Sequence, residues 1–160
     1  MGQLNFFAPL DKLGRTPIHH AAFNGELETI KYLVNLTDNP LAASQNGSTP
    51  INCAAANGHL ESLKFLVCLT EQNPMVPNNM GFTPINSAAM FGCMLQYESS
   101  SKPVESFFEM VKFMIRFTDN PNISFNGLTP PGLARRIGHL NYMECFKFSC
   151  LIWRRKFLKF

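Results

Sequence analysis

The chain has 160 residues, of which 46% are apolar and 16% are charged. These proportions describe one soluble domain that is large enough to bury a core, and they exclude disordered and collagen-like chains. Fifteen phenylalanines and eight methionines indicate that irregular gaps between packed helices are filled, because the flexible methionine side chain adapts to such spaces.

The net charge of +3 is unevenly distributed along the chain. Residues 147–160 contain five basic and no acidic residues, so residues 1–146, with nine basic and eleven acidic residues, carry a net charge of −2. The body of the chain therefore offers no general electrostatic attraction to nucleic acid.

Several features predict an intracellular protein without a membrane span. The longest uncharged stretch, residues 72–97, is interrupted by Pro74, Pro77 and Pro84, so it is unsuited to cross a lipid bilayer. The first ten residues lack the basic start and long apolar run of a secretory signal. Five cysteines without a C-x-x-C pair fit reduced thiols rather than disulfides. We expect a cytoplasmic location, and a nuclear one stays open.

The first predicted element is a helix that begins at Thr16-Pro17. The threonine hydroxyl can accept from an unpaired amide of the first turn, and proline at the first helical position loses no hydrogen bond. Gly25 can adopt the left-handed conformation that ends the helix after about two turns. A second helix follows at once, since its apolar residues have helical spacing; they are Leu27, Ile30, Leu33, Val34 and Leu36.

The same pattern returns along the chain. Thr-Pro recurs at Thr49, Thr83 and Thr129, with spacings of 33, 34 and 46 residues from one threonine to the next. Each Thr-Pro follows a glycine two residues earlier and precedes another nine residues after the threonine. Between the units, Asn46-Gly47 predicts a tight hairpin turn.

The segment Thr16-Pro17-Ile18-His19-His20-Ala21-Ala22 resembles the T-P-L-H-x-A signature of the ankyrin repeat family. The resemblance covers residues 11 to about 150 and implies an all-α solenoid of stacked antiparallel helix pairs with β-hairpin fingers. It divides the chain into repeat one (11–43), repeat two (44–77), repeat three (78–123) and repeat four (124–150). Members of this family bind proteins, which implies a protein partner here.

Departures from the family pattern carry their own predictions. Asn52 and Asn86 replace the family histidine that His19 supplies, and we expect them to keep its hydrogen-bonding role. Repeat four has Arg135 and Arg136 where the other repeats have small or apolar residues, which favours a terminal, capping repeat. Residues 6–10 look like the end of a preceding unit, so they either fold back as a half-repeat or the chain is a piece of a longer array.

Repeat three contains an insertion of about a dozen residues near 93–104. Its polar, serine-rich content predicts a mobile excursion between the two helices of that repeat. It is either a partner-specific loop or a tolerated insertion, because long surface loops cost little stability.

No enzyme motif is present, and we expect neither catalysis nor a cofactor or metal ion. The sequence has no G-x-S-x-G, no glycine-rich phosphate loop and no H-E-x-x-H. His19 and His20 are adjacent, so on a helix they point about 100° apart and are poorly placed to bind one metal ion.

The resemblance implies that a partner contacts the finger tips and the inner-helix face of the groove. Apolar and aromatic residues at such exposed positions are typical of interface hot spots, although several of them could instead pack between fingers. The implied partner-binding residues are Lys12, Leu13, Arg15, Phe23, Asn24, Gln45, Asn46, Ser48, Ala56, Asn57, Asn79, Met80, Phe82, Met90, Phe91, Phe125, Asn126 and Leu128.

Residues 151–160 form a basic, aromatic tail that supports an alternative function. Trp153, Phe157 and Phe160 alternate with arginine and lysine residues, a mixture suited to an anionic membrane surface or to nucleic acid. We favour the interpretation that the tail is an extended last helix whose aromatic residues cover the end of the stack, because its apolar and basic residues do not separate into two faces. The main hypothesis is a non-catalytic scaffold that binds an unidentified protein, with no small-molecule substrate.

Overall fold

The computed structural model describes residues 11–71, 73–88 and 104–117 of the chain. Residues 84–88 are helical, and no described residue lies in a β-strand, which confirms the predicted all-α fold. The labelled elements are the helices α1 (Pro17–Asn24), α2 (Leu27–Val34), α3 (Pro50–Ala56), α4 (Leu60–Cys68) and α6 (Val104–Met114) and the 3-10 helix η1 (Ile115–Phe117).

The inner helix of a repeat is its first helix, and α1 and α3 are the inner helices of repeats one and two. Both begin at Thr-Pro, as the sequence predicts. Thr16 and Thr49 have extended backbones, and proline occupies the first helical position of α1 and α3. The threonine hydroxyl accepts from the backbone N–H of Asn52 in repeat two, at 3.5 Å, and from that of Asn86 in repeat three, at 3.3 Å. In repeat one Thr16 and His19 form a capping box, and Nδ1 of His19 accepts from the Thr16 N–H at 3.1 Å.

Gly25 ends α1 for two reasons. Its φ of +77° is left-handed, a conformation that costs a residue with a Cβ atom about 1 kcal/mol. A Cβ at this position would also collide with the imidazole ring of His59, with its nearest contact at Nδ1. The same imidazole lies 3.0 Å, through Nε2, from the carbonyl oxygen of Phe23, so the glycine lets repeat two close against the end of α1.

The second helices α2 and α4 run back along the inner helices. Leu60, Leu63, Leu66 and Val67 all lie in α4, whereas Leu36 lies in a turn just beyond the end of α2. Lys31 pairs with Glu28 at 2.7 Å, and Lys64 pairs with Glu61 at 2.8 Å. These predicted pairs are exposed, so each contributes little to stability.

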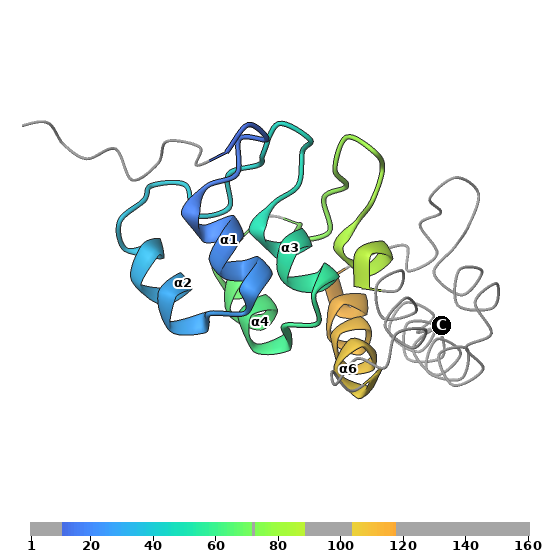
Figure 1. Cartoon of the computed structure of the whole chain (residues 1–160). Helices are drawn as coiled ribbons and strands as arrows, with labels where there is room; N and C mark the ends of the chain where they lie inside the picture. The colour runs from blue at the N-terminus through green and yellow to red at the C-terminus, as the bar shows by residue number, and fades with distance from the viewer. Residues whose placement is uncertain (1–10, 72, 89–103, 118–160) are drawn as a thin grey trace, which may run out of the picture.

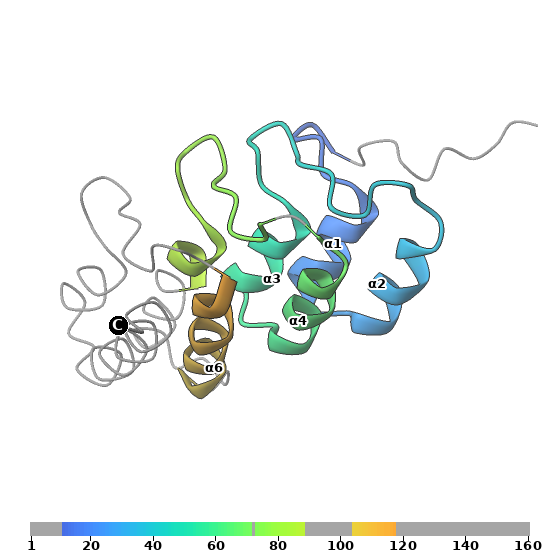
Figure 2. The same cartoon turned by 180° about the vertical axis from the view of Figure 1, so that it is seen from behind.

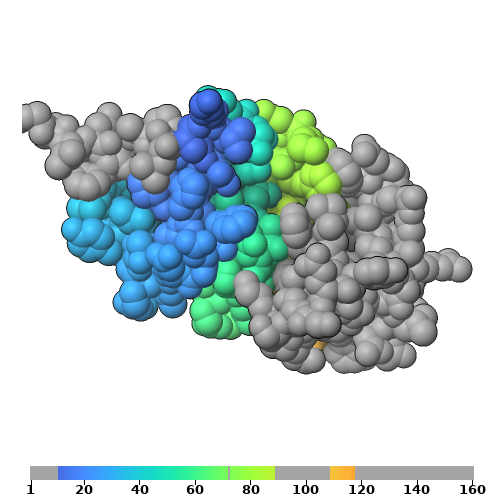
Figure 3. Space-filling view, viewed as in Figure 1, coloured from blue at the N-terminus to red at the C-terminus, as the bar shows by residue number. Residues whose placement is uncertain are grey.

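Figures 1 and 2 show the helix pairs stacked in one row. α1 packs against α3, and α2 packs against α4, which in turn contacts α6. Three loops rise on one side of the row beyond the starts of the inner helices (Figure 1), and the space-filling view shows them in contact with one another (Figure 3). We call residues 11–15, 44–48 and 78–82 the first, second and third finger.

One continuous core lies between the inner and second helices. Ala22, Ala54, Ala55 and Ala88 are completely buried, because small side chains let neighbouring inner helices approach closely. Ile30, Leu63 and Leu66 of the second helices are also completely buried. The inner helices therefore pack closely side by side at the repeated alanine residues.

The predicted fourth repeat and tail lie outside the described residues, as does almost all of the insertion, since Val104 already belongs to α6. Among the described helices, none combines the length and the apolar character that crossing a membrane requires.

Candidate functional site

Each finger is a tight turn that a glycine closes. The backbone N–H of Gly47 donates to the carbonyl oxygen of Ser44 at 2.8 Å, and that of Gly81 donates to Asn78 at 2.8 Å. The backbone N–H of Ser44 donates to Ser48, and that of Asn78 to Phe82, both at 2.9 Å. The predicted tight turn at residues 44–47 is thus present, and its backbone bonds are hairpin-like although no strand forms.

Side chains at the start of each finger hold its shape. Oδ1 of Asp11 accepts from the backbone N–H groups of Leu13 and Arg15, both at 3.0 Å. Oδ1 of Asn78 repeats this pattern in the third finger, accepting from Met80 and Phe82 at 3.0 Å. Such local bonds are what make aspartate and asparagine suitable turn residues.

Neighbouring fingers are joined by main-chain hydrogen bonds. The N–H of Gln45 donates to the carbonyl oxygen of Leu13 at 2.9 Å, and the N–H of Asn79 donates to that of Asn46 at 2.9 Å. Nδ2 of Asn79 also donates to the carbonyl oxygen of Gln45 at 3.0 Å. The three fingers therefore form one connected array.

His19 and its replacement Asn52 each tie an inner helix to the next finger. His19 is fully buried; its Nδ1 accepts from the Thr16 N–H at 3.1 Å, and its Nε2 lies 2.9 Å from the Ser48 carbonyl oxygen. A carbonyl oxygen can only accept, so the proton of the neutral ring belongs on Nε2. In repeat two, Nδ2 of Asn52 donates to the Phe82 carbonyl oxygen at 3.4 Å, which confirms the expected replacement.

A groove of about 340 Å³ runs between the fingers and the inner helices of three repeats. Leu13, Phe23 and Met80 are its most exposed apolar side chains, at 49%, 48% and 61%. Exposed aromatic and methionine side chains of this kind are typical of protein interfaces. The groove is lined by Leu13, Arg15, Phe23, Asn46, Ser48, Asn52, Cys53, Ala56, Asn78, Met80, Phe82 and Ser87.

Eight of these twelve lining residues are ones that sequence reasoning assigned to partner binding. Phe82 is half-buried rather than fully exposed. Some predicted residues at the finger tips or at the ends of the inner helices do not line the groove: Lys12, Asn24, Gln45, Asn57 and Asn79. Others lie outside the described residues: Met90, Phe91, Phe125, Asn126 and Leu128.

Four lining residues were missing from the sequence-based set: Asn52, Cys53, Asn78 and Ser87. Asn78 could have been found from the repeat period, since it stands five residues before Thr83, as Asp11 stands before Thr16. Cys53 and Ser87 lie on turns of the inner helices that contain the buried alanines, so the sequence pattern assigned these segments to the core.

Charge in the groove is confined to its repeat-one end. Nε of Arg15 lies 2.6 Å from Oδ2 of Asp11, and Nε2 of His20 lies 3.4 Å from the same oxygen. The Arg15 backbone N–H, followed by the Arg15 side chain, lowers the pKa of Asp11 to about 2. Asp11 therefore stays ionised and paired at neutral pH.

Two further groups bear on the chemistry available. Burial raises the pKa of the Cys53 thiol to about 11, so this thiol is protonated at neutral pH and is a weak nucleophile. Within residues 11–71, 73–88 and 104–117, no three His, Cys, Asp or Glu side chains are grouped to hold a metal ion.

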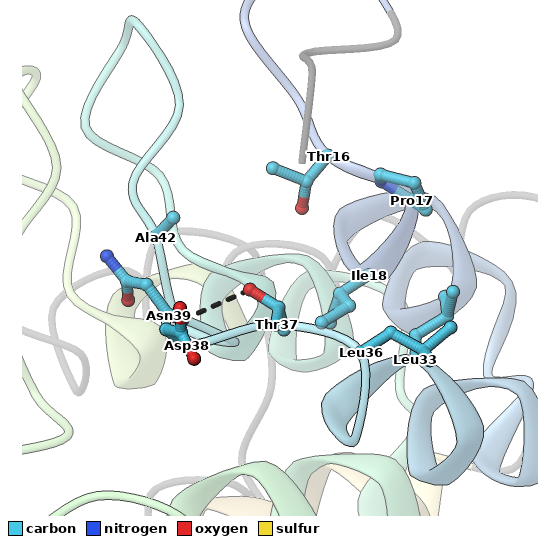
Figure 4. A pocket seen from close by; sticks show the side chains of 9 residues that line it. All are labelled: Thr16, Pro17, Ile18, Leu33, Leu36, Thr37, Asp38, Asn39 and Ala42. Atoms are coloured by element: carbon cyan, nitrogen blue, oxygen red, sulfur yellow. Dashed lines mark hydrogen bonds between the residues drawn. The ribbon is translucent and has the colours of Figure 1, made fainter. Parts of the chain in front are cut away.

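A second hollow, of about 180 Å³, lies at the repeat-one end of the stack (Figure 4). Ile18, Leu33 and Leu36 form its apolar part, and the loop after α2 borders it. One repeat later, Pro50 and Leu66 are fully buried, whereas Pro17 and Leu33 are only half-buried. The hollow thus lies on a face that is open in repeat one and covered in repeat two, and no residue predicted for partner binding lines it.

Comparison with known proteins identifies the repeats. Residues 4–78 match the family model described as ankyrin repeats (3 copies). No curated protein matches the chain.

The fold is similar to that of an ankyrin repeat domain from Acinetobacter baumannii AYE, solved by crystallography at 1.00 Å resolution. The TM-score is 0.73 at 22% sequence identity, and the match covers 91% of this chain and 69% of that domain. The ankyrin fold that the sequence predicts is therefore confirmed.

Proposed function

We propose that the chain is a non-catalytic scaffold that binds another protein through the groove between its fingers and inner helices. Ankyrin repeats generally mediate protein–protein interaction. The observation that carries the proposal is the gathering of Leu13, Phe23 and Met80, all about half-exposed or more, around one groove that spans three repeats. Exposed apolar side chains that line a common groove favour a binding surface over isolated surface residues.

The finger array supports useful affinity for such a partner. Main-chain bonds join Gln45 to Leu13 and Asn79 to Asn46, so the side chains that they carry are held at set spacings before binding. Little conformational entropy is then lost when a partner docks. The protonated Cys53 thiol fits this non-catalytic role, since it is poorly activated for covalent chemistry.

Affinity capture with matched variants tests the proposal. The double variant Phe23→Ser and Met80→Ser removes two exposed apolar groups from the groove. The control Tyr32→Ser and Val76→Ser removes two comparably exposed groups, at 67% and 51%, that do not line it. Each protein is immobilised, and captured proteins are quantified by mass spectrometry. We expect the groove variant, but not the control, to lose a common set of partners.

A third arm tests the alternative function of the tail. The chain without residues 151–160 should capture the same partners as the full chain if the groove is the binding site. Loss of all partners on tail deletion, together with full capture by the groove variant, would contradict the proposal and support the membrane or nucleic-acid adaptor. Helical circular dichroism of every variant establishes that the fold is retained.

A further inference from the structure

Most polar side chains that line the groove are already engaged in holding the fold. Asn78 uses Oδ1 for two finger amides and donates from Nδ2 to Oγ of Ser48 at 3.2 Å. Asn52 accepts from Thr49 and donates to the Phe82 carbonyl oxygen. Oδ1 of Asn46 accepts from the Ser44 hydroxyl and the Ser48 N–H. A bound molecule therefore meets few uncommitted polar groups among these asparagines.

Apolar contact must then supply most of the binding free energy. Leu13 and Met80 reach the groove from the first and third fingers, and Phe23 reaches it from the end of α1. Their exposure of 48% to 61% leaves substantial apolar surface to be covered. A complementary molecule needs large apolar side chains at more than one point along its length.

Basic side chains lie at only one end of the described groove, so its two ends differ in charge. Among the residues that the structure describes, no acidic one lines the groove. Arg15 lines the repeat-one end, and Lys12 is exposed on the same finger. The only acidic residue of that finger, Asp11, is paired with Arg15. At the repeat-three end the lining residues Asn78, Met80, Phe82 and Ser87 are all uncharged.

Acidic residues of the described chain are otherwise placed on or beside the second helices. Glu28 lies on α2, Glu61 on α4 and Glu109 on α6, while Glu26, Asp38 and Glu71 flank these helices. The described lining of the groove is thus apolar and uncharged polar except for Arg15, which is paired with Asp11, whereas the second helices carry mixed charge. A ligand with carboxylates is attracted to the first finger and meets no acidic side chain in the groove.

We propose that the groove binds a peptide segment that carries both large apolar and acidic side chains. Its apolar side chains contact Phe23, Met80 and Leu13, and a carboxylate lies beside Lys12 and Arg15 of the first finger. This inference rests on the proposed function, and it adds the chemistry of the partner and its orientation along the stack. The apolar anchors favour a peptide over a nucleic acid, because the phosphate groups of a nucleic acid would contact only the basic side chains of the first finger.

Selection from a random twelve-residue peptide library displayed on phage, with the full chain as bait, tests this proposal. We expect enriched peptides to combine Leu, Ile, Met, Phe or Trp with Asp or Glu. One enriched peptide is then synthesised with a fluorescent label, and its dissociation constant is measured by anisotropy at 50 mM and 500 mM NaCl. Binding should weaken at the higher salt concentration, because the charged contact is exposed.

Two charge-reversed variants make the electrostatic test specific. Lys12→Glu changes the first finger, and Lys31→Glu makes the same change in net charge on α2, away from the groove. We expect Lys12→Glu to weaken the labelled peptide about fivefold and Lys31→Glu to leave its affinity within about twofold. Met80→Ser should weaken it about tenfold, as expected for an apolar anchor.

The outcomes separate this inference from the proposed function. Enriched peptides without acidic residues, or equal effects of Lys12→Glu and Lys31→Glu, would overturn the acidic partner while Met80→Ser still established the groove. Peptides insensitive to both Met80→Ser and Phe23→Ser, or no enriched peptide at all, would overturn both. A labelled single-stranded oligonucleotide that binds with the Lys12 dependence but without the Met80 dependence would overturn the peptide in favour of nucleic acid.

Discussion

The imidazole of His19 joins two repeats, with Nε2 lying 2.9 Å from the carbonyl oxygen of Ser48 in the second finger. Its other nitrogen, Nδ1, accepts from the Thr16 N–H. A protonated imidazole could not accept that bond, because both ring nitrogens would then carry hydrogen. The link between α1 and the second finger is therefore made by the neutral side chain.

This link predicts acid-sensitive stability. Burial lowers the pKa of His19 from its ordinary value of 6.5, so the unfolded chain binds this proton more readily than the folded chain. The contribution of His19 is complete above pH 6.5 and falls as the pH drops from 6.5 to its folded pKa, by at most about 1.4 kcal/mol per pH unit. Urea unfolding at pH 7.5 and pH 5.5 measures this loss.

The variant His19→Asn is the matched control, since asparagine occupies the same position in repeats two and three as Asn52 and Asn86. We expect it to cost about 1 kcal/mol at pH 7.5 and to lose less stability than the wild type on acidification. Parallel pH profiles for the two proteins would show that His19 does not cause the acid sensitivity.

Gly25→Ala should destabilise the chain more than Gly14→Ala. Both glycines have left-handed φ values, +77° and +71°, so each change costs about 1 kcal/mol from the backbone. A Cβ at Gly25 also meets the ring of His59, whereas one at Gly14 meets mainly the flexible Gln45 side chain. We expect losses of about 3 and 1 kcal/mol, measured by urea unfolding. Equal losses would mean that His59 moves aside freely.

Leu66→Ala should cost about 3 kcal/mol, since Leu66 is completely buried and its removal leaves a cavity. Leu33, the equivalent residue one repeat earlier, is half-buried beside the hollow at the repeat-one end. Its change to alanine should cost about 1 kcal/mol, because less apolar surface is lost. Thermal and urea unfolding measure both values. A larger loss for Leu33→Ala would contradict the open face described above.

Cysteine labelling tests the chemistry of the groove. Cys53 is half-buried, and its pKa is raised to about 11, whereas Cys68 is exposed. Only the thiolate reacts with iodoacetamide, so at pH 7.5 Cys53 should be alkylated at least about tenfold more slowly than Cys68. Peptide mapping by mass spectrometry separates the two sites. Similar rates would indicate that Cys53 is far more accessible than its burial implies.

The local elements could be predicted because each has its own short-range cause. Thr16-Pro17 and Thr49-Pro50 start helices, and Gly25 ends one, through backbone preferences that need no knowledge of the rest of the fold. Leu36 was misplaced in the helix, because helical spacing alone does not mark where α2 ends at Val34.

The groove could be predicted only in part. Leu13, Phe23 and Met80 were found because exposed apolar residues stand out against the repeat pattern. Gln45 and Asn79 were expected to contact a partner, and the structure adds a role that the sequence did not predict, since both bond to a neighbouring finger. Such contacts between repeats depend on the spacing of the stack, which a single unit of sequence does not contain.

Main-chain hydrogen bonds join Leu13 to Gln45 and Asn46 to Asn79. The spacing of the fingers therefore does not depend on which side chains their tips carry. Under the proposed function, point substitutions at Lys12 or Met80 change the binding surface but leave the main-chain bonds that set its spacing intact. On this proposal, evolution can change the partner without changing the fold, and two chains with the same stack but different finger-tip residues need not bind the same partner.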